Sequence, residues 1–93
     1  MALIADKDVK VFDLTEIHRG DCVRVRKNGD DSFRNGVVIK AEESKIVVLY
    51  SNIQNEATSY LFIFPADVAD DAWEMYWTTD FVTINHIGGD GNA

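Results

Sequence analysis

The sequence predicts an all-β domain in which five to six short antiparallel strands form a small barrel. Turn-forming clusters recur roughly every 8 to 12 residues, and the segments between them are rich in valine, isoleucine and aromatic residues. No apolar period longer than one helical turn runs through the chain. A length of 93 residues predicts one domain.

The most regular strand is expected at residues 22 to 27, where CVRVRK alternates apolar and basic residues. Val23 and Val25 face one side of the predicted sheet and Arg24 and Arg26 the other, because successive side chains of a strand point to opposite faces. This strand is half-buried, with a basic outer surface.

A hairpin is expected at residues 34 to 51, where two β-branched runs flank a charged tip at residues 42 to 44. We expect one face of the hairpin to carry Val37, Ile39, Ile46, Val48 and Tyr50. The opposite face then carries Val38, Val47 and Leu49. Since both faces are apolar, the pattern indicates a curled sheet that is covered on each side.

Turn-forming residues predict where the other strands and loops begin and end. Residues 28 to 36 contain two Asn-Gly pairs and predict an exposed loop. A fourth strand ends at Pro65, which cannot donate to a strand ladder. Proline at a first helical position predicts one helical or 3-10 turn near residues 65 to 72. The last two strands are expected at residues 73 to 77 and 81 to 85.

The barrel domain is expected at residues 14 to 86. Residues 1 to 13 have no clear period and are interpreted as an N-terminal arm or an added edge strand. Residues 87 to 93 contain three glycines and are interpreted as a flexible tail.

The net charge of -7 is unevenly distributed. Residues 19 to 45 hold seven of the nine basic residues, whereas residues 46 to 93 hold seven acids and neither lysine nor arginine. Nucleic acid is disfavoured as a partner because such binding draws on phosphate neutralisation by lysine and arginine.

The sequence favours a cytoplasmic location without a membrane. The single cysteine, Cys22, excludes an internal disulfide. The start of the chain lacks the basic and apolar regions of a secretory signal. The longest apolar run, at residues 60 to 66, is far shorter than the roughly 18 residues of a membrane span.

Four features together resemble the SH3-like small barrels. They are the entry IHRGDCVRVR, the hairpin NGVVIKAEESKIVVLY, the apolar strand closed by Pro65 and a single turn, and the short last strand. The ending PADVADDAWEMYWTTDFVTIN is also similar to that of uncharacterised small barrels of bacteria and their mobile elements. Peptide-binding SH3 domains have a tryptophan opening the third strand, whereas here the tryptophans fall on the penultimate strand, so proline binding is not carried over.

The aromatic residues of the second half allow two interpretations. Alternation places Trp73, Met75 and Trp77 on one face of their strand, either closing the core or contributing to an exposed patch. The Tudor members of the SH3-like group bind methyl-lysine in an aromatic cage, and Tyr50, Tyr60, Trp73, Tyr76 and Trp77 could supply such a cage if they converge.

We expect no catalytic residue, no cofactor and no metal ligand. Cys22 with His18 or His86 has no recognised nucleophile signature. The histidines with the turn acids Asp67, Asp70 and Asp71 match neither a zinc spacing nor a calcium loop.

The function expected from the sequence is a non-enzymatic protein-interaction module. It would bind a protein partner or another copy through strand edges and an aromatic patch. The candidate surface is Trp73, Tyr76, Trp77, Tyr50, Tyr60, Arg24 and Arg26. The two arginines are interpreted either as a solvated strand face or as groups that grip an acidic partner or the chain's own acidic half. Two alternatives remain: an acidic regulator or nucleic-acid mimic that engages a basic partner, and a small metal protein or hydrolase.

Overall fold

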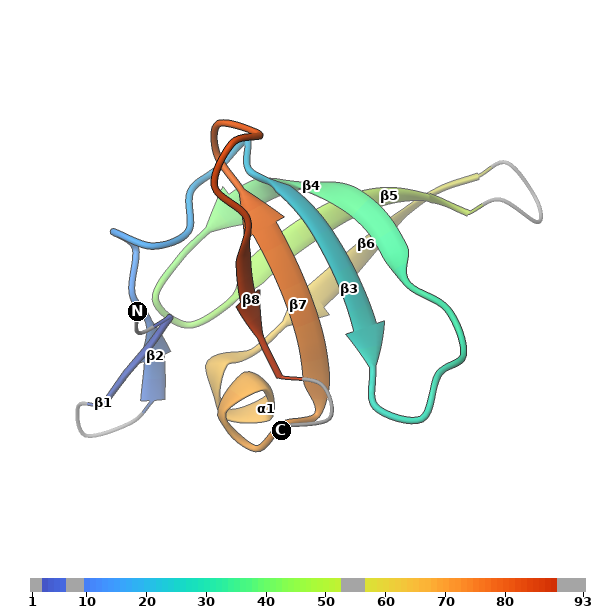
Figure 1. The fold of residues 1–93 in the computed structure, drawn as a ribbon. Helices are drawn as coiled ribbons and strands as arrows, with labels where there is room; N and C mark the ends of the chain where they lie inside the picture. The colour runs from blue at the N-terminus through green and yellow to red at the C-terminus, as the bar shows by residue number, and fades with distance from the viewer. Residues whose placement is uncertain (1–2, 7–9, 53–56, 89–93) are drawn as a thin grey trace.

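The main feature of the computed structural model, which describes residues 3–6, 10–52 and 57–88, is an antiparallel sheet of strand order β6-β5-β4-β3-β7-β8 (Figure 1). Its strands are β3 (Cys22–Lys27), β4 (Arg34–Ala41), β5 (Ile46–Asn52), β6 (Ala57–Ile63), β7 (Trp73–Thr78) and β8 (Asn85–Ile87). The all-β prediction with one short helical turn is confirmed, since α1 (Pro65–Ala69) lies between β6 and β7.

A closed barrel, in contrast, is not seen in the part of the chain that the structure describes. The sheet curls strongly, but β6 and β8 remain its two edges (Figure 1). β8 has only three residues, too few to build a long ladder with a second neighbour. Other elements cover the concave side of the sheet instead.

The first of these covering elements is a hairpin of β1 (Ile4–Asp6) and β2 (Lys10–Phe12), which pair in a separate two-stranded sheet. Leu3 and Phe12 are buried, and the backbone N–H of Phe12 donates to the Glu43 carbonyl at 2.9 Å. Within the stretch interpreted as an arm or edge strand, the described residues Leu3 and β2 therefore cover the core. Residues 89–93 of the expected tail lie outside the described residues.

The second covering element is α1, which packs against β1, β2 and β7. Pro65 occupies its first turn, where the missing N–H loses no helical hydrogen bond. Pro65 and Val68 are buried. With five residues, α1 is too short to cross a membrane, and the described residues contain no other helix that could do so.

The core side of the sheet, called here the core face, carries the alternating apolar residues of β3 and β7. Val23 pairs with Trp77 and Val25 with Met75, and all four are buried. The other side, called the outer face, carries Cys22, Arg24 and Arg26 of β3. The predicted alternation of β3 is thus confirmed.

The predicted faces of the β4–β5 hairpin are confirmed for β5, where Ile46, Val48 and Tyr50 share the core face, but they are wrong for β4. Val38, rather than Val37 or Ile39, pairs with Val48 on the core face, and Val37 pairs with Leu49 on the outer face. Next to the turn, the pairs Lys40↔Val47 and Ala41↔Ile46 fit the expected register, but a β-bulge at Ile39 then shifts it by one residue. Because strand side chains alternate, this shift moves every β4 side chain beyond Ile39 to the other face.

Gly36 lies within β4 and not in a turn as its Asn-Gly pair suggested. A Cβ at this position would overlap the carbonyl oxygen of Leu49 and lie 2.7 Å from Val48 Cγ1. The glycine therefore permits the close approach of β4 and β5. Only the first Asn-Gly pair forms a turn, with Gly29 at a φ of 96°.

Candidate functional site

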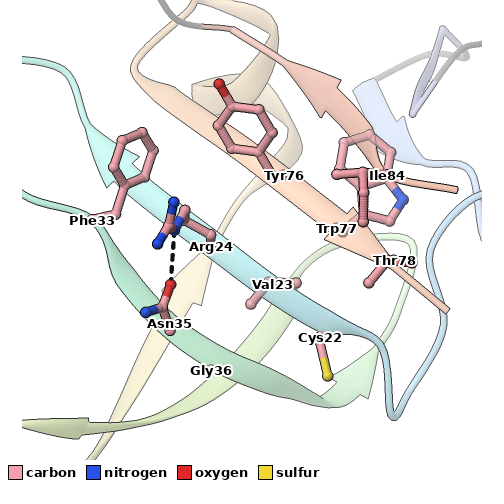
Figure 2. A pocket seen from close by; sticks show the side chains of 10 residues that line it. All are labelled: Cys22, Val23, Arg24, Phe33, Asn35, Gly36, Tyr76, Trp77, Thr78 and Ile84. Carbon is pink, nitrogen blue, oxygen red and sulfur yellow. Dashed lines mark hydrogen bonds between the residues drawn. The ribbon is translucent and has the colours of Figure 1, made fainter. Parts of the chain in front are cut away.

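The candidate site is a groove of about 530 Å³ on the outer face, above β3 (Figure 2). We call it the outer groove, and its side chains include Cys22, Arg24, Phe33, Tyr76, Thr78 and Ile84. The register of β3 and β7 sets its floor, because Cys22 pairs with Thr78 and Arg24 with Tyr76. Loop residues Phe33 and Ile84 stand at its sides.

Aromatic and guanidinium groups form one wall of the outer groove. The Phe33 ring centroid lies 5.9 Å from that of Tyr76. The guanidinium carbons of Arg24 and Arg26 lie 5.5 and 4.7 Å from the Phe33 centroid, within the range of a cation–π contact. Phe33 therefore packs against both arginines of β3.

The two arginines differ in their polar partners. Arg26 Nη2 donates to Glu74 Oε1 at 2.6 Å, an ion pair between β3 and the acidic second half of the chain. Arg24 is exposed, and its Nε donates to the neutral side chain of Asn35 at 3.0 Å (Figure 2). Within the described residues, Arg24 has no carboxylate partner.

Glu74 is buried opposite Arg26 on β7 and joins three strands. Besides Arg26, it accepts a hydrogen bond from the Tyr76 hydroxyl at 3.2 Å, and its Oε2 lies 3.1 Å from His86 Nε2. Burial opposes its ionisation, but the hydrogen bonds from Arg26, His86 and Tyr76 outweigh burial, so the pKa of Glu74 lies below its ordinary value. Burial and the bond to Glu74 raise the pKa of Tyr76.

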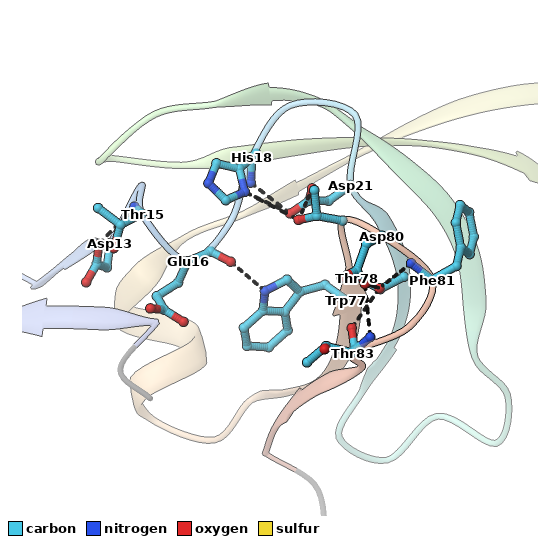
Figure 3. A network of polar contacts seen from close by, with 11 residues as sticks. Asp13, Thr15, Glu16, His18, Asp21, Trp77, Thr78, Asp80, Phe81 and Thr83 are labelled. Atoms are coloured by element: carbon cyan, nitrogen blue, oxygen red, sulfur yellow. Dashed lines mark hydrogen bonds and ion pairs between the residues drawn. The ribbon is translucent and has the colours of Figure 1, made fainter.

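One end of the outer groove, at Thr78 and Ile84, adjoins residues 79–84, which connect β7 to β8 and are called here the apical loop. Asp80 Oδ1 accepts the backbone N–H groups of Val82 and Thr83 at 2.8 and 2.9 Å. The Thr78 hydroxyl donates to the Thr83 carbonyl at 2.7 Å and accepts the N–H of Phe81 at 2.9 Å (Figure 3). Side chains thus fix the loop backbone.

The tip of the apical loop is apolar and exposed. Phe81, Val82 and Ile84 expose 73%, 83% and 57% of their surface. Phe81 has a φ of 62°, a left-handed conformation that is rare for a bulky residue. Hydrogen bonds from Thr83 and Val82 to Asp80 hold the pKa of that carboxyl below its usual range. The loop presents apolar side chains on a strained but well-bonded backbone.

Buried Asp21 ties the apical loop to the segment before β3. Its Oδ2 accepts the backbone N–H of His18 at 2.9 Å, and its Oδ1 accepts the Thr79 hydroxyl at 2.8 Å (Figure 3). Beside it, the Trp77 indole N–H donates to the Glu16 carbonyl at 2.8 Å. The bonds made by Thr79 and Trp77 hold the loop end of β7 in place.

A family model described as a domain of unknown function, DUF5026, matches residues 3–84. The chain belongs to the DUF5026 family. The DUF5026 match includes the outer groove and the apical loop and ends before β8. No curated protein and no solved structure matches the chain.

In this DUF5026 domain, the predicted aromatic residues do not gather at one place. Trp73 and Trp77 are core residues, with 6% and 1% of their surface exposed. Tyr76 lies on the outer face, whereas Tyr50 shares the core face with Gly36 and stacks against Arg34. Tyr60 lies on edge strand β6. Of the candidate surface, the outer groove contains Arg24, Tyr76 and the buried Trp77.

The residues weighed for nucleophilic chemistry have separate surroundings. His18 Nδ1 lies 3.6 Å from Asp21 Oδ2, whereas the His86 ring stacks on Tyr76 with centroids 4.3 Å apart. Cys22 lines the outer groove. Among the described residues, no group of three or more His, Cys, Asp or Glu side chains could hold a metal ion.

Sequence reasoning missed Phe33 and the apical loop. The prediction of a strand at residues 81 to 85 is wrong, because the bonds to Asp80 and Thr78 and the left-handed Phe81 take this segment out of the sheet until Asn85. The signal was present in Thr-Thr-Asp, since threonine and aspartate side chains bond to nearby backbone and favour turns.

Proposed function

We propose that this domain is a non-enzymatic protein-interaction module that binds a protein partner with the outer groove and the adjoining apical loop. The observation that carries the proposal is the exposure of Phe81, Val82 and Ile84 on a loop whose backbone is fixed by hydrogen bonds. Exposed apolar side chains beside an apolar groove mark an interaction site, because their burial against a partner is favourable.

The fixed backbone strengthens this proposal. A loop that is ordered before binding loses little conformational entropy when a partner docks, so the contact area contributes more to affinity. The strain at Phe81 points the same way, since backbone strain of this kind is retained mainly at functional sites. Aromatic residues such as Phe81 and Tyr76 are also enriched at interfaces.

The test is crosslinking and affinity capture from a lysate of the source organism, comparing the native chain with the double variant Phe81→Ser/Val82→Ser. Leu14→Ser is the matched control because Leu14 is an exposed apolar residue outside the outer groove. We expect one protein to be captured by the native chain and the control and to be lost with the loop variant. Capture that is absent, or equal for all three chains, contradicts the proposal.

A second candidate function, self-association through β6, rests on a separate observation. β6 is an edge of the sheet, has seven residues, and contains no charge, proline or bulge. Edge strands normally carry such features to prevent pairing with another chain. Tyr60 and Phe62 expose 62% and 52% of their surface. An antiparallel pair of β6 strands from two copies would bring Tyr60 and Phe62 of one copy beside cross-strand neighbours of the other and bury part of their exposed surface.

Sedimentation velocity over a hundredfold concentration range tests this second candidate. We expect a concentration-dependent dimer that disappears with Phe62→Lys and persists with Phe81→Lys, a matched change at the apical loop. Self-association through β6 is contradicted if the native chain stays monomeric or if Phe62→Lys does not change the amount of dimer.

The proposal also includes the fold family and the cellular location of the domain. Kinship with the SH3-like small barrels is supported by the curled sheet and by the single-turn helix before β7. Action in the cytoplasm is supported by the single free thiol of Cys22. The alternative of an acidic regulator predicts binding that weakens steeply with salt, whereas binding by the apical loop changes little.

A further inference from the structure

We propose that the outer groove binds an extended segment of a protein partner in which an internal aspartate or glutamate stands between two apolar residues, with Arg24 pairing the carboxylate. This inference rests on the proposed function and names the chemistry of the partner. Arg24 carries a positive charge between apolar groups on either side, and the neighbouring Arg26 is already paired with Glu74.

Arg24 is available for an acidic group because the chain supplies it with a neutral partner. Asn35 accepts only from Nε, at 3.0 Å, so the two terminal amino groups of the guanidinium keep donors to spare, and Arg24 lines the outer groove. The neighbouring Arg26 is already neutralised by Glu74 at 2.6 Å. The contact with the Phe33 ring, at 5.5 Å, holds the Arg24 guanidinium in position for a bidentate pair.

Apolar groups flank Arg24 along the strand direction. Cys22 lies two residues from Arg24, toward the apical loop, and forms one end of the outer groove with Ile84. At the other end, Phe33 contacts both arginines of β3. Residues two apart in a strand are separated by roughly 6.6 Å. A partner therefore reaches Arg24 and both apolar ends with three consecutive alternating positions, apolar, acidic and apolar.

This arrangement favours an internal acidic side chain over a chain terminus. A C-terminal carboxylate at Arg24 would leave one apolar end of the outer groove without a partner residue. A basic segment is disfavoured by the charge of Arg24. The net charge of -7 repels acidic partners at long range, so the attraction must come from this local pair and its apolar neighbours.

The test uses a synthetic library of nine-residue peptides, capped at both ends, with Glu, Gln or Lys at the centre and Phe, Leu, Val or Ala at the second position on either side. Binding is measured by fluorescence anisotropy and mapped by amide chemical shifts. We expect Glu peptides with bulky neighbours to bind about tenfold more tightly than their Gln counterparts, with shifts at Cys22, Tyr76 and Thr78.

Two variants decide the role of Arg24. With Arg24→Gln, the Glu and Gln peptides are expected to bind equally, while Arg19→Gln, the same charge change at an exposed site outside the outer groove, keeps the tenfold preference. Amide spectra of the free variants report that each is folded. A peptide ending in a free carboxylate at the same position is expected to bind no better than the capped Gln peptide.

The outcomes separate this inference from the proposed function. Equal binding of Glu, Gln and Lys peptides in the outer groove overturns the acidic partner and leaves the interaction module intact. If the peptide with a free carboxylate binds more tightly, the outer groove recognises a chain terminus. That result also overturns the inference of an internal acidic residue. If no peptide binds, the inference is wrong, and the capture experiment with the apical loop variant alone decides the proposed function.

Discussion

The indole N–H of Trp77 donates to the backbone carbonyl of Glu16 at 2.8 Å, which joins the most buried aromatic residue of β7 to the segment before β3. The bond closes the end of the core that lies beneath the apical loop (Figure 3). Trp77 therefore supports the candidate site from below while taking almost no part in its surface.

Replacing Trp77 by phenylalanine is expected to lower the free energy of unfolding by about 1 to 3 kcal/mol, because the hydrogen bond is lost and a cavity is left. Urea unfolding followed by circular dichroism measures the change. Leu14→Ala is the control, since an exposed apolar side chain is expected to change stability by less than about 0.5 kcal/mol. An unchanged urea midpoint for Trp77→Phe contradicts the described packing.

The ionised form of Glu74 is expected to stabilise the fold. Its pKa is lower in the folded chain than in the unfolded one, so its contribution is present above the ordinary pKa of about 4.3 and is lost as the pH falls through the folded value. Thermal unfolding between pH 7 and pH 3 measures this loss.

Other groups add to the same trend, because Asp13 and Asp80 also have a lowered pKa. The decisive quantity is therefore the difference in melting temperature between the native chain and Glu74→Gln. We expect this difference to be largest near neutral pH and to shrink in acid. A difference that does not depend on pH would show that Glu74 acts by packing alone.

Replacing Phe81 by glycine is expected to raise the stability of the domain by up to about 1 kcal/mol, because glycine adopts the left-handed conformation without the strain of a side chain. Val82→Gly is the matched control, since Val82 is not among the described residues with positive φ, and there the same change is expected to destabilise. Urea midpoints of both variants test the pair. Destabilisation by Phe81→Gly equal to that of Val82→Gly means that Phe81 carries no strain.

Adding a methyl group at Gly36 is expected to destabilise the domain by about 1 to 3 kcal/mol, because the new Cβ collides with the backbone of β5. At Gly29 a Cβ meets no atom within 4 Å, and only the φ of 96° opposes the change. Gly29→Ala is therefore expected to be the milder of the two in urea unfolding. The reverse order would show that β4 and β5 are less closely packed than described.

Much of the fold follows from local patterns in the sequence. The alternation of CVRVRK and WEMYW is enough to place Val23 with Val25, and Met75 with both tryptophans, on one face of their strand, because a two-residue period leaves each side chain only two directions. The burial of that face of β7 is seen in the structure. Pro65 likewise marks where β6 must end and where a helical turn can begin.

The candidate site was less accessible to such reasoning. Phe33, Arg24 and Ile84 come from three separate segments, and only the tertiary fold brings them to one groove. The faces of the β4–β5 hairpin depend on one extra residue, which composition does not mark. The division of roles between the two arginines depends on which of them lies opposite Glu74, and hence on the register of β3 with β7.

Because of the bulge at Ile39, a deletion in β4 has a different effect at the bulge than elsewhere in the strand. Removal of Ile39 would bring Val38 next to Lys40, and the pairs Val38↔Val48 and Lys40↔Val47 would then run on as one regular ladder. Each remaining side chain would keep its side of the sheet, although the extra twist that a bulge gives would be lost. Removal of a residue between Arg34 and Val37 leaves the bulge in place. The side chains at the start of β4 would then point to the opposite face of the sheet. Loss of one residue at the bulge therefore leaves the inner and outer faces of β4 as they are, whereas loss of one residue nearer Arg34 exchanges them.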